Sequence, residues 1–185
     1  RFGFPMGPFA VGDMSGLDIA WRMRQRLAPT RDPRARYCEL PDRLCELGRL
    51  GQKTGAGWYR YAAGDRKGQV DESVHAIILA HAQAKGVTRR TFSADEIVER
   101  VLVTMTNEIA TLVEDGIAMR ASDADLVLVN GYGFPRHEGG PVFWASRQPR
   151  ARLAAQRATL REVTGHGFRE GNVEALLEQW AAQQH

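Results

Sequence analysis

Apolar residues recur at helical spacing along most of the chain, and glycine or proline ends most of these runs. The first run predicts a helix over residues 10–28, with Asp13 or Ser15 able to cap its start and Pro29 at its end. Convincing strand alternation is confined to residues 58–61. The expected fold class is therefore all-α. Further helices are expected over residues 39–48, 71–85, 122–129, 149–164 and 172–183.

The longest predicted helix covers residues 93–116. It opens on a capping box, Ser93 to Glu96, and Gly116 is placed to end it. Its apolar residues follow a close a/d-like spacing, which favours burial against partner helices. The expected buried stripe is Ile97, Val98, Val101, Leu102, Met105, Ile109, Leu112 and Val113.

A glycine–proline pattern occurs twice, over residues 2–9 and 132–143. In both copies an aromatic residue and a glycine precede Phe-Pro, and a Gly-Pro pair follows with an aromatic close behind. Proline fixes φ and glycine supplies φ values that other residues avoid, so each copy predicts a rigid, apolar-lined corner. We expect two related helical units in tandem: an incomplete first unit over 1–62, a connecting segment with one helix over 63–92, and a second unit over 93–185.

Two further stretches accompany the corners: residues 48–61, with glycines at 51, 55 and 57, and residues 107–118. Together with the corners, they resemble the C-terminal helical region of 3-hydroxyacyl-CoA dehydrogenases. The pattern is most similar to the multifunctional enzymes of fatty-acid β-oxidation, which carry two such units in tandem. The resemblance implies that the parent protein oxidises (S)-3-hydroxyacyl-CoA to 3-oxoacyl-CoA with NAD, and enoyl-CoA hydratase activity is a second expectation for that parent.

The residues that carry the family's chemistry are missing from this sequence. The family's His–Glu pair has no counterpart here, and no Gly-x-Gly-x-x-Gly turn follows a strand. In the helix of the second unit, Glu99 stands where the resemblance places a substrate-binding Asn. We therefore expect no catalytic residue in this chain and no activity from it alone. NAD is expected to bind mainly to an upstream Rossmann domain, which is then a partner of these helices.

The resemblance carries four site residues over to this chain. Lys53 matches the lysine that reaches the cofactor, and its ordinary alternative is a solvated surface lysine. Pro5 and Val11 match positions that line the acyl pocket, where simple core packing is the competing interpretation. Asn130 matches a position that is often a substrate-contacting Tyr, so the departure puts that contact in question. The five histidines lack a metal-ligand spacing, and no metal site is expected.

Composition narrows the remaining classes of function. The 185 residues carry a net charge of +3 without one concentrated basic patch, which disfavours nucleic-acid binding and is compatible with an acyl-CoA substrate. No apolar run approaches the roughly 18 residues of a membrane span. Cys38 and Cys45 have neither a zinc nor a redox spacing, so we expect reduced thiols and a cytoplasmic location. A homo-oligomer is expected, and the alternative function is a non-catalytic helical interaction or dimerisation module.

Overall fold

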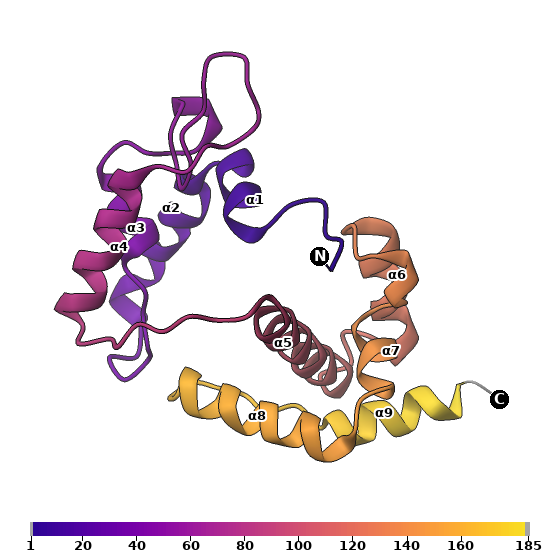
Figure 1. Ribbon diagram of the computed structural model, residues 1–185. Coiled ribbons are helices and arrows are strands. Elements are labelled where there is room, and N and C mark those ends of the chain that lie inside the picture. Colours follow the sequence, from indigo (N-terminus) through magenta and orange to yellow (C-terminus); the bar gives the residue numbers. More distant parts are fainter. Residues whose placement is uncertain (1, 184–185) are drawn as a thin grey trace. The chain divides into compact units, whose positions relative to one another are not determined.

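The computed structural model describes residues 2–183, and within this range the regular structure is helical (Figure 1). The expected all-α class is confirmed. Isolated β-bridges occur only between residues 51 and 69 of the described chain. The helices are α1 (Pro8–Ser15), α2 (Leu17–Leu27), α3 (Leu40–Glu46), α4 (Glu72–Ala84), α5 (Ala94–Glu114), α6 (Ala121–Gly131), α7 (Pro141–Ser146), α8 (Arg150–Thr164) and α9 (Val173–Ala182), with short 3₁₀ turns at Ala28–Thr30, Gln52–Thr54 and Arg136–Glu138.

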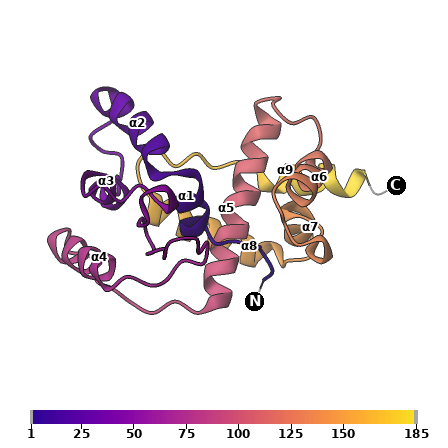
Figure 2. The ribbon, with the colours of Figure 1, turned by 90° about the horizontal axis from the view of Figure 1, so that it is seen from above.

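The chain folds into two compact units. One, called here the α1–α4 unit, consists of residues 6–91, and the other, the α5–α9 unit, consists of residues 92–185 together with residues 1–5. Figure 2 follows the same helices from above. The division expected from the sequence, into segments 1–62, 63–92 and 93–185, rests on the internal repeat and not on compactness. It stays a prediction.

The single helix expected over residues 10–28 is wrong, because Gly16 interrupts it. Gly16 has φ +96°, a conformation that only glycine adopts without strain, and the chain turns there between α1 and α2. The break therefore divides the expected helix into α1 and α2. In the α1–α4 unit the core consists of Leu17, Leu44, Cys45 and Val74, with Trp21, Leu50, Trp58, Ile77 and Ile78 packed against it.

Helix α5 starts and ends as predicted, but its buried face agrees only in part with the expected stripe. The Ser93 hydroxyl accepts from the Glu96 N–H at 3.1 Å, which confirms the cap. Ile97 and Val101 of the expected stripe are about half exposed, at 51% and 45%. The buried face consists of Leu102 and Ile109 from that stripe, together with Val103, Thr106, Asn107, Ala110 and Thr111.

Polar residues can lie on this buried face because backbone groups form hydrogen bonds with their side chains. The Thr106 hydroxyl donates to the Leu102 carbonyl at 2.8 Å. The Asn107 amide donates to the Arg169 carbonyl at 2.9 Å and accepts from the Gly171 N–H at 3.0 Å. A buried polar group that keeps its hydrogen bonds costs little, so a pattern of apolar residues alone does not locate this face.

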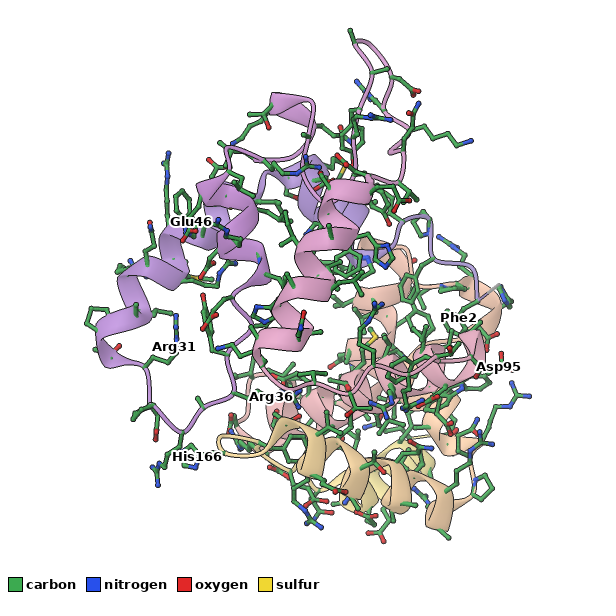
Figure 3. All side chains as sticks on the ribbon, turned by 60° about the vertical axis from the view of Figure 1, so that its left-hand side comes forward. Phe2, Arg31, Arg36, Glu46, Asp95 and His166 are labelled. Atoms are coloured by element: carbon green, nitrogen blue, oxygen red, sulfur yellow. The ribbon has the colours of Figure 1, made fainter. Side chains whose placement is uncertain are left out.

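The two Gly-Phe-Pro corners lie against each other in the α5–α9 unit. The rings of Phe4 and Phe134 meet edge to face with centroids 5.4 Å apart. Phe2, which is labelled in Figure 3, contacts both rings. A Cβ on Gly3 would lie 3.3 Å from Pro135, and the neighbour of Gly133 is likewise the other corner's proline, Pro5, at 3.1 Å. The contacts are therefore reciprocal. Each corner also leads into a short helix with proline in its first turn.

Candidate functional site

Residues 48–61, named here the Lys53 loop, form a compact turn in the α1–α4 unit. Lys53 lies at the centre of the 3₁₀ turn Gln52–Thr54, between Gly51 at φ +102° and Gly55 at φ +72°. A Cβ at Gly51 would lie 2.2 Å from the backbone oxygen of Asp13. Glycine is therefore required at this position both for its φ and for the space it leaves.

Asp13 of α1 holds the far end of this loop. Its carboxylate is 1% exposed and accepts from the N–H groups of Trp58 and Tyr59, both at 2.9 Å, and from the Tyr61 hydroxyl at 3.0 Å. Burial, with this hydrogen bond as the second cause, raises the pKa of Tyr61 to about 12. A Cβ on Gly57 would lie 2.0 Å from the Asp13 carboxylate. Contrary to the prediction from the sequence, Asp13 therefore does not cap its helix but lies inside α1 and binds the loop.

The Lys53 ammonium extends from the loop to the first turn of α2, where it forms an ion pair with Asp18. The hydrogen bond from Lys53 is the main cause that lowers the pKa of Asp18. The lysine side chain remains 49% exposed. An ammonium has three donors, and the bond to Asp18 uses one, so the group can also bind an anionic or hydroxyl ligand.

Two side chains of the loop itself, Arg49 and Trp58, attach it to the rest of the α1–α4 unit. Arg49 donates to the Gly57 carbonyl at 2.9 Å and reaches the carboxylate of Asp71 at 2.8 Å. Hydrogen bonds from Ser73 first, and then from Arg49, lower the pKa of Asp71 to about 2. The ring of Trp58 lies 4.5 Å from that of Phe9, and Trp58 also packs on the core. The contacts of Trp58 therefore hold the loop in place.

The other predicted site residues fall in both units. Val11 lies on α1 and is 42% exposed. Pro5 is exposed in the corner beside Gly133. Asn130, near the end of α6, is exposed and donates to the Leu126 carbonyl at 2.9 Å. Val11 thus shares a unit with Lys53, while Pro5 and Asn130 share the other, and the substrate roles of the three stay predictions.

A second buried carboxylate, that of Asp125 in α6, binds the start of α7. It is 5% exposed and accepts from the N–H groups of Val142 at 2.8 Å and Phe143 at 2.9 Å. Asp125 lies inside α6, which begins after Arg120, and its carboxylate binds the next helix. Burial raises the pKa of Asp125 to about 6, against the opposing effect of the two N–H groups.

This raised pKa predicts a pH dependence of stability. Between about pH 4 and pH 6 the folded α5–α9 unit holds a proton on Asp125 that the unfolded chain has released. Stability should therefore fall by about 2–3 kcal/mol as pH rises through this window. Urea unfolding of wild type and Asp125→Asn at a series of pH values isolates this contribution. An equal pH slope in both proteins would contradict it.

Neither a metal centre nor a membrane span is found in the described residues 2–183. Among residues 2–183, no cluster of His, Cys, Asp and Glu could hold a metal ion. None of the helices in the same range is long and apolar enough to cross a bilayer. Cys38 is exposed and Cys45 is buried, and both are free thiols, as expected.

Comparison with known proteins identifies relatives of this chain. Residues 1–61 match the family model "3-hydroxyacyl-CoA dehydrogenase, C-terminal domain". The peroxisomal bifunctional enzyme of Homo sapiens is 43% identical over 158 residues, covering 79% of this chain and 22% of the relative. The enzyme of the same name from Danio rerio is 40% identical over 157 residues, with 78% and 22% covered. The chain thus spans about a fifth of the length of these relatives.

A solved structure shares the fold. The dehydrogenase part of multifunctional enzyme 1 from C. elegans matches with a TM-score of 0.66 and 23% identity, over 95% of this chain and 39% of that one. At this identity the likeness concerns the fold alone.

The relatives also correct one expectation. The cytoplasmic location expected from the two reduced cysteines is wrong, since the relatives are peroxisomal enzymes. Free thiols show only that a compartment does not drive disulfide formation. Residues 1–61 are thus recognised as a C-terminal domain of 3-hydroxyacyl-CoA dehydrogenase, and 79% of the chain is similar to part of a peroxisomal bifunctional enzyme.

Proposed function

We propose that this chain forms the C-terminal helical region of an NAD-dependent 3-hydroxyacyl-CoA dehydrogenase of fatty-acid β-oxidation. The parent protein oxidises (S)-3-hydroxyacyl-CoA to 3-oxoacyl-CoA, carries enoyl-CoA hydratase activity as well, and works in the peroxisome like its relatives. The observation that supports this most strongly is the 43% identity to a peroxisomal bifunctional enzyme along 79% of the chain. In this proposal the helices form part of the acyl-CoA pocket and bury domain or subunit interfaces.

The proposed contribution of this chain is binding and positioning. Bound NAD supplies the hydride acceptor, and the nicotinamide chemistry belongs to the cofactor. The Lys53 loop is suited to form a small part of the cofactor site. Its half-exposed ammonium, on a rigid turn, can bind a ribose hydroxyl or the pyrophosphate. Pro5, Val11 and Asn130 are the proposed contacts to the acyl substrate.

The buried hydrogen bonds around Asp13 support a binding role for the Lys53 loop. They fix the backbone on one side of the lysine, and Asp18 holds the ammonium near one position. A cation that is already positioned loses less rotational freedom when a ligand binds. A purely solvated lysine would need neither constraint.

Lys53→Ala in the complete protein should raise the KM for NAD about tenfold or more, because one charge-assisted hydrogen bond is worth about 1.5–3 kcal/mol and about 1.4 kcal/mol is a factor of ten. The KM for the acyl-CoA should change little. Steady-state NADH formation measures both constants. Lys67→Ala is the matched control, since Lys67 is an exposed lysine close by in sequence. If Lys53→Ala keeps the wild-type KM for NAD, the cofactor role of Lys53 is wrong.

One observation favours the alternative, a helical module that serves only assembly. Helices α1 and α2 expose several large apolar side chains, which is typical of an interaction surface. The two functions differ in what the parent gene must encode. A dehydrogenase needs a strand–turn–helix with Gly-x-Gly-x-x-Gly before this region, whereas an assembly module does not.

A further inference from the structure

Helices α4 and α5 are joined by the longest exposed stretch of the described chain. Every residue from 83 to 95 is exposed, and the part between Ala84 and Ala94 contains no helix. The boundary between the two compact units falls inside it, after Thr91. Residues 86–93 are named here the α4–α5 linker. Exposed connections of this kind are preferred sites of proteolytic cleavage, so the residues of the linker decide which class of protease can cut it.

The backbone of the linker is open to a binding partner. The Val87 N–H donates to the Ala82 carbonyl at 2.8 Å, which closes α4. Beyond it, neither Thr88 nor Arg89 forms a hydrogen bond with another described residue. An extended peptide is recognised through its main-chain hydrogen bonds, so a protease needs backbone groups that the fold leaves unpaired. The linker supplies such groups.

Two consecutive arginines, Arg89 and Arg90, stand in the middle of the linker. A trypsin-like serine protease binds the residue before the scissile bond in a pocket that carries an aspartate, which suits arginine. The Arg90 guanidinium donates to the Thr91 carbonyl at 3.2 Å, an exposed contact that binding to a protease can replace. The linker therefore combines an open backbone with the side chain that this class of protease recognises.

Two other exposed loops that carry basic residues are held by hydrogen bonds. Between α2 and α3, the Arg34 N–H donates to the Asp32 carboxylate at 2.9 Å, and the Arg34 guanidinium binds the same carboxylate at 2.7 Å. In the loop before α4, the Lys67 N–H donates to the Asp65 carboxylate at 2.8 Å. A protease can cut such a turn only after it has opened, so cleavage is slowed in proportion to the rarity of the open form.

We propose that the α4–α5 linker is a processing site for a trypsin-like serine protease, which cleaves the chain after Arg89 or Arg90. Water adds to the carbonyl carbon of the arginine and the bond to the following nitrogen breaks, which leaves a carboxylate and a free amino group. Because the boundary of the compact units lies after Thr91, the cut removes no helix from either unit. It ends the covalent connection between the Lys53 loop and helices α5 to α9.

The cut does not divide the compact units cleanly between the two products. The first product keeps residues 1–5, although these residues pack in the α5–α9 unit. In that unit the rings of Phe4 and Phe134 have centroids 5.4 Å apart, and neither residue is near the scissile bonds in sequence. The cleaved α5–α9 unit therefore contains residues of both products.

Limited proteolysis with trypsin tests the proposal on this 185-residue chain and on the protein made from the complete reading frame. Mass spectrometry identifies each bond that is cut. Within residues 1–185 of both proteins, the first cut should fall after Arg89 or Arg90. It should be at least ~10-fold faster than cleavage after Arg34 or Lys67, because those turns must open first. The double variant Arg89→Gln with Arg90→Gln should be cut in the linker at least ~10-fold more slowly, because glutamine leaves the charged pocket unpaired.

Two controls separate the recognition of arginine from the exposure of the linker. Arg34→Gln removes the same charge from a loop that is held by hydrogen bonds, and it should leave the rate of the first cut unchanged. Subtilisin, which does not require a basic residue before the scissile bond, should cut the linker of the double variant as fast as that of the wild type. Such a result shows that the double variant keeps the linker open.

Three outcomes would overturn the proposal. The first is a first trypsin cut elsewhere within residues 1–185, such as after Arg34 or Lys67. The second is an equal rate of linker cleavage in the wild type and the double variant. The third is cleavage of the linker in the 185-residue chain but not in the complete protein, which would mean that another part of the parent covers the site. None of these outcomes depends on dehydrogenase activity.

Discussion

Replacing Asp13 by alanine should lower the free energy of unfolding of the α1–α4 unit by about 3–5 kcal/mol. The substitution leaves the N–H groups of Trp58 and Tyr59 and the hydroxyl of Tyr61 without their acceptor. A buried donor without a partner costs about 1–3 kcal/mol, and water that enters the space recovers part of the sum. Because the same bonds fix the Lys53 loop, the loop should also become mobile.

Hydrogen exchange of peptides from residues 48–61 follows the Asp13 variant locally, and urea unfolding gives its free energy. Asp65→Ala is the matched control: Asp65 is exposed and its carboxylate accepts from the Lys67 N–H at 2.8 Å. It should change stability by no more than about 0.5 kcal/mol. A loss below about 1 kcal/mol for Asp13→Ala would mean that the loop is held by other contacts.

Gly140→Ala should destabilise the α5–α9 unit by at least about 3 kcal/mol. Gly140 has φ +119°, and a Cβ there would lie 2.2 Å from the carboxyl carbon of Asp125. The backbone of α7 and the Asp125 side chain cannot both keep their places. The hydrogen bonds to Val142 and Phe143 should then be lost along with the packing of α7.

Thermal and urea unfolding measure the Gly140 variant. The control is Gly131→Ala, at the end of α6, where a Cβ would meet no atom within 4 Å and φ is ordinary. That change should be neutral or stabilising by up to about 1 kcal/mol, since alanine favours helix more than glycine does. Similar stabilities for the two variants would show that the contact between Gly140 and Asp125 is not restrictive.

Local signals in the sequence predicted most helices, because caps and stops act over a few residues. Ser93 caps α5, and Gly116, with φ +68°, follows its end. The break at Gly16 was missed, since a single glycine in an apolar run does not reveal its φ. Leu102 and Ile109 of α5 are buried as predicted, but Thr106 and Asn107 are not predictable in this way because they owe their burial to distant backbone partners.

The candidate site shows the same limit. The glycines around Lys53 indicated a special loop, and the structure explains them by the close approach of Asp13. The role of Asp13 itself could not be predicted, because its partners lie 45 to 48 residues further along the chain. Asp125 differs in sequence from an exposed helix-start residue in no visible way. Its partners at α7 follow 17 and 18 residues later.

The most direct test of the proposed function is NADH formation from (S)-3-hydroxybutyryl-CoA and NAD, measured with the complete protein and with this chain alone. The complete protein should form NADH, and the isolated chain should form none, because its sequence lacks the family's His–Glu pair and the cofactor-binding turn. Measurable NADH formation by the pure 185-residue chain, or none by the folded complete protein, would contradict the assignment of this region to a 3-hydroxyacyl-CoA dehydrogenase.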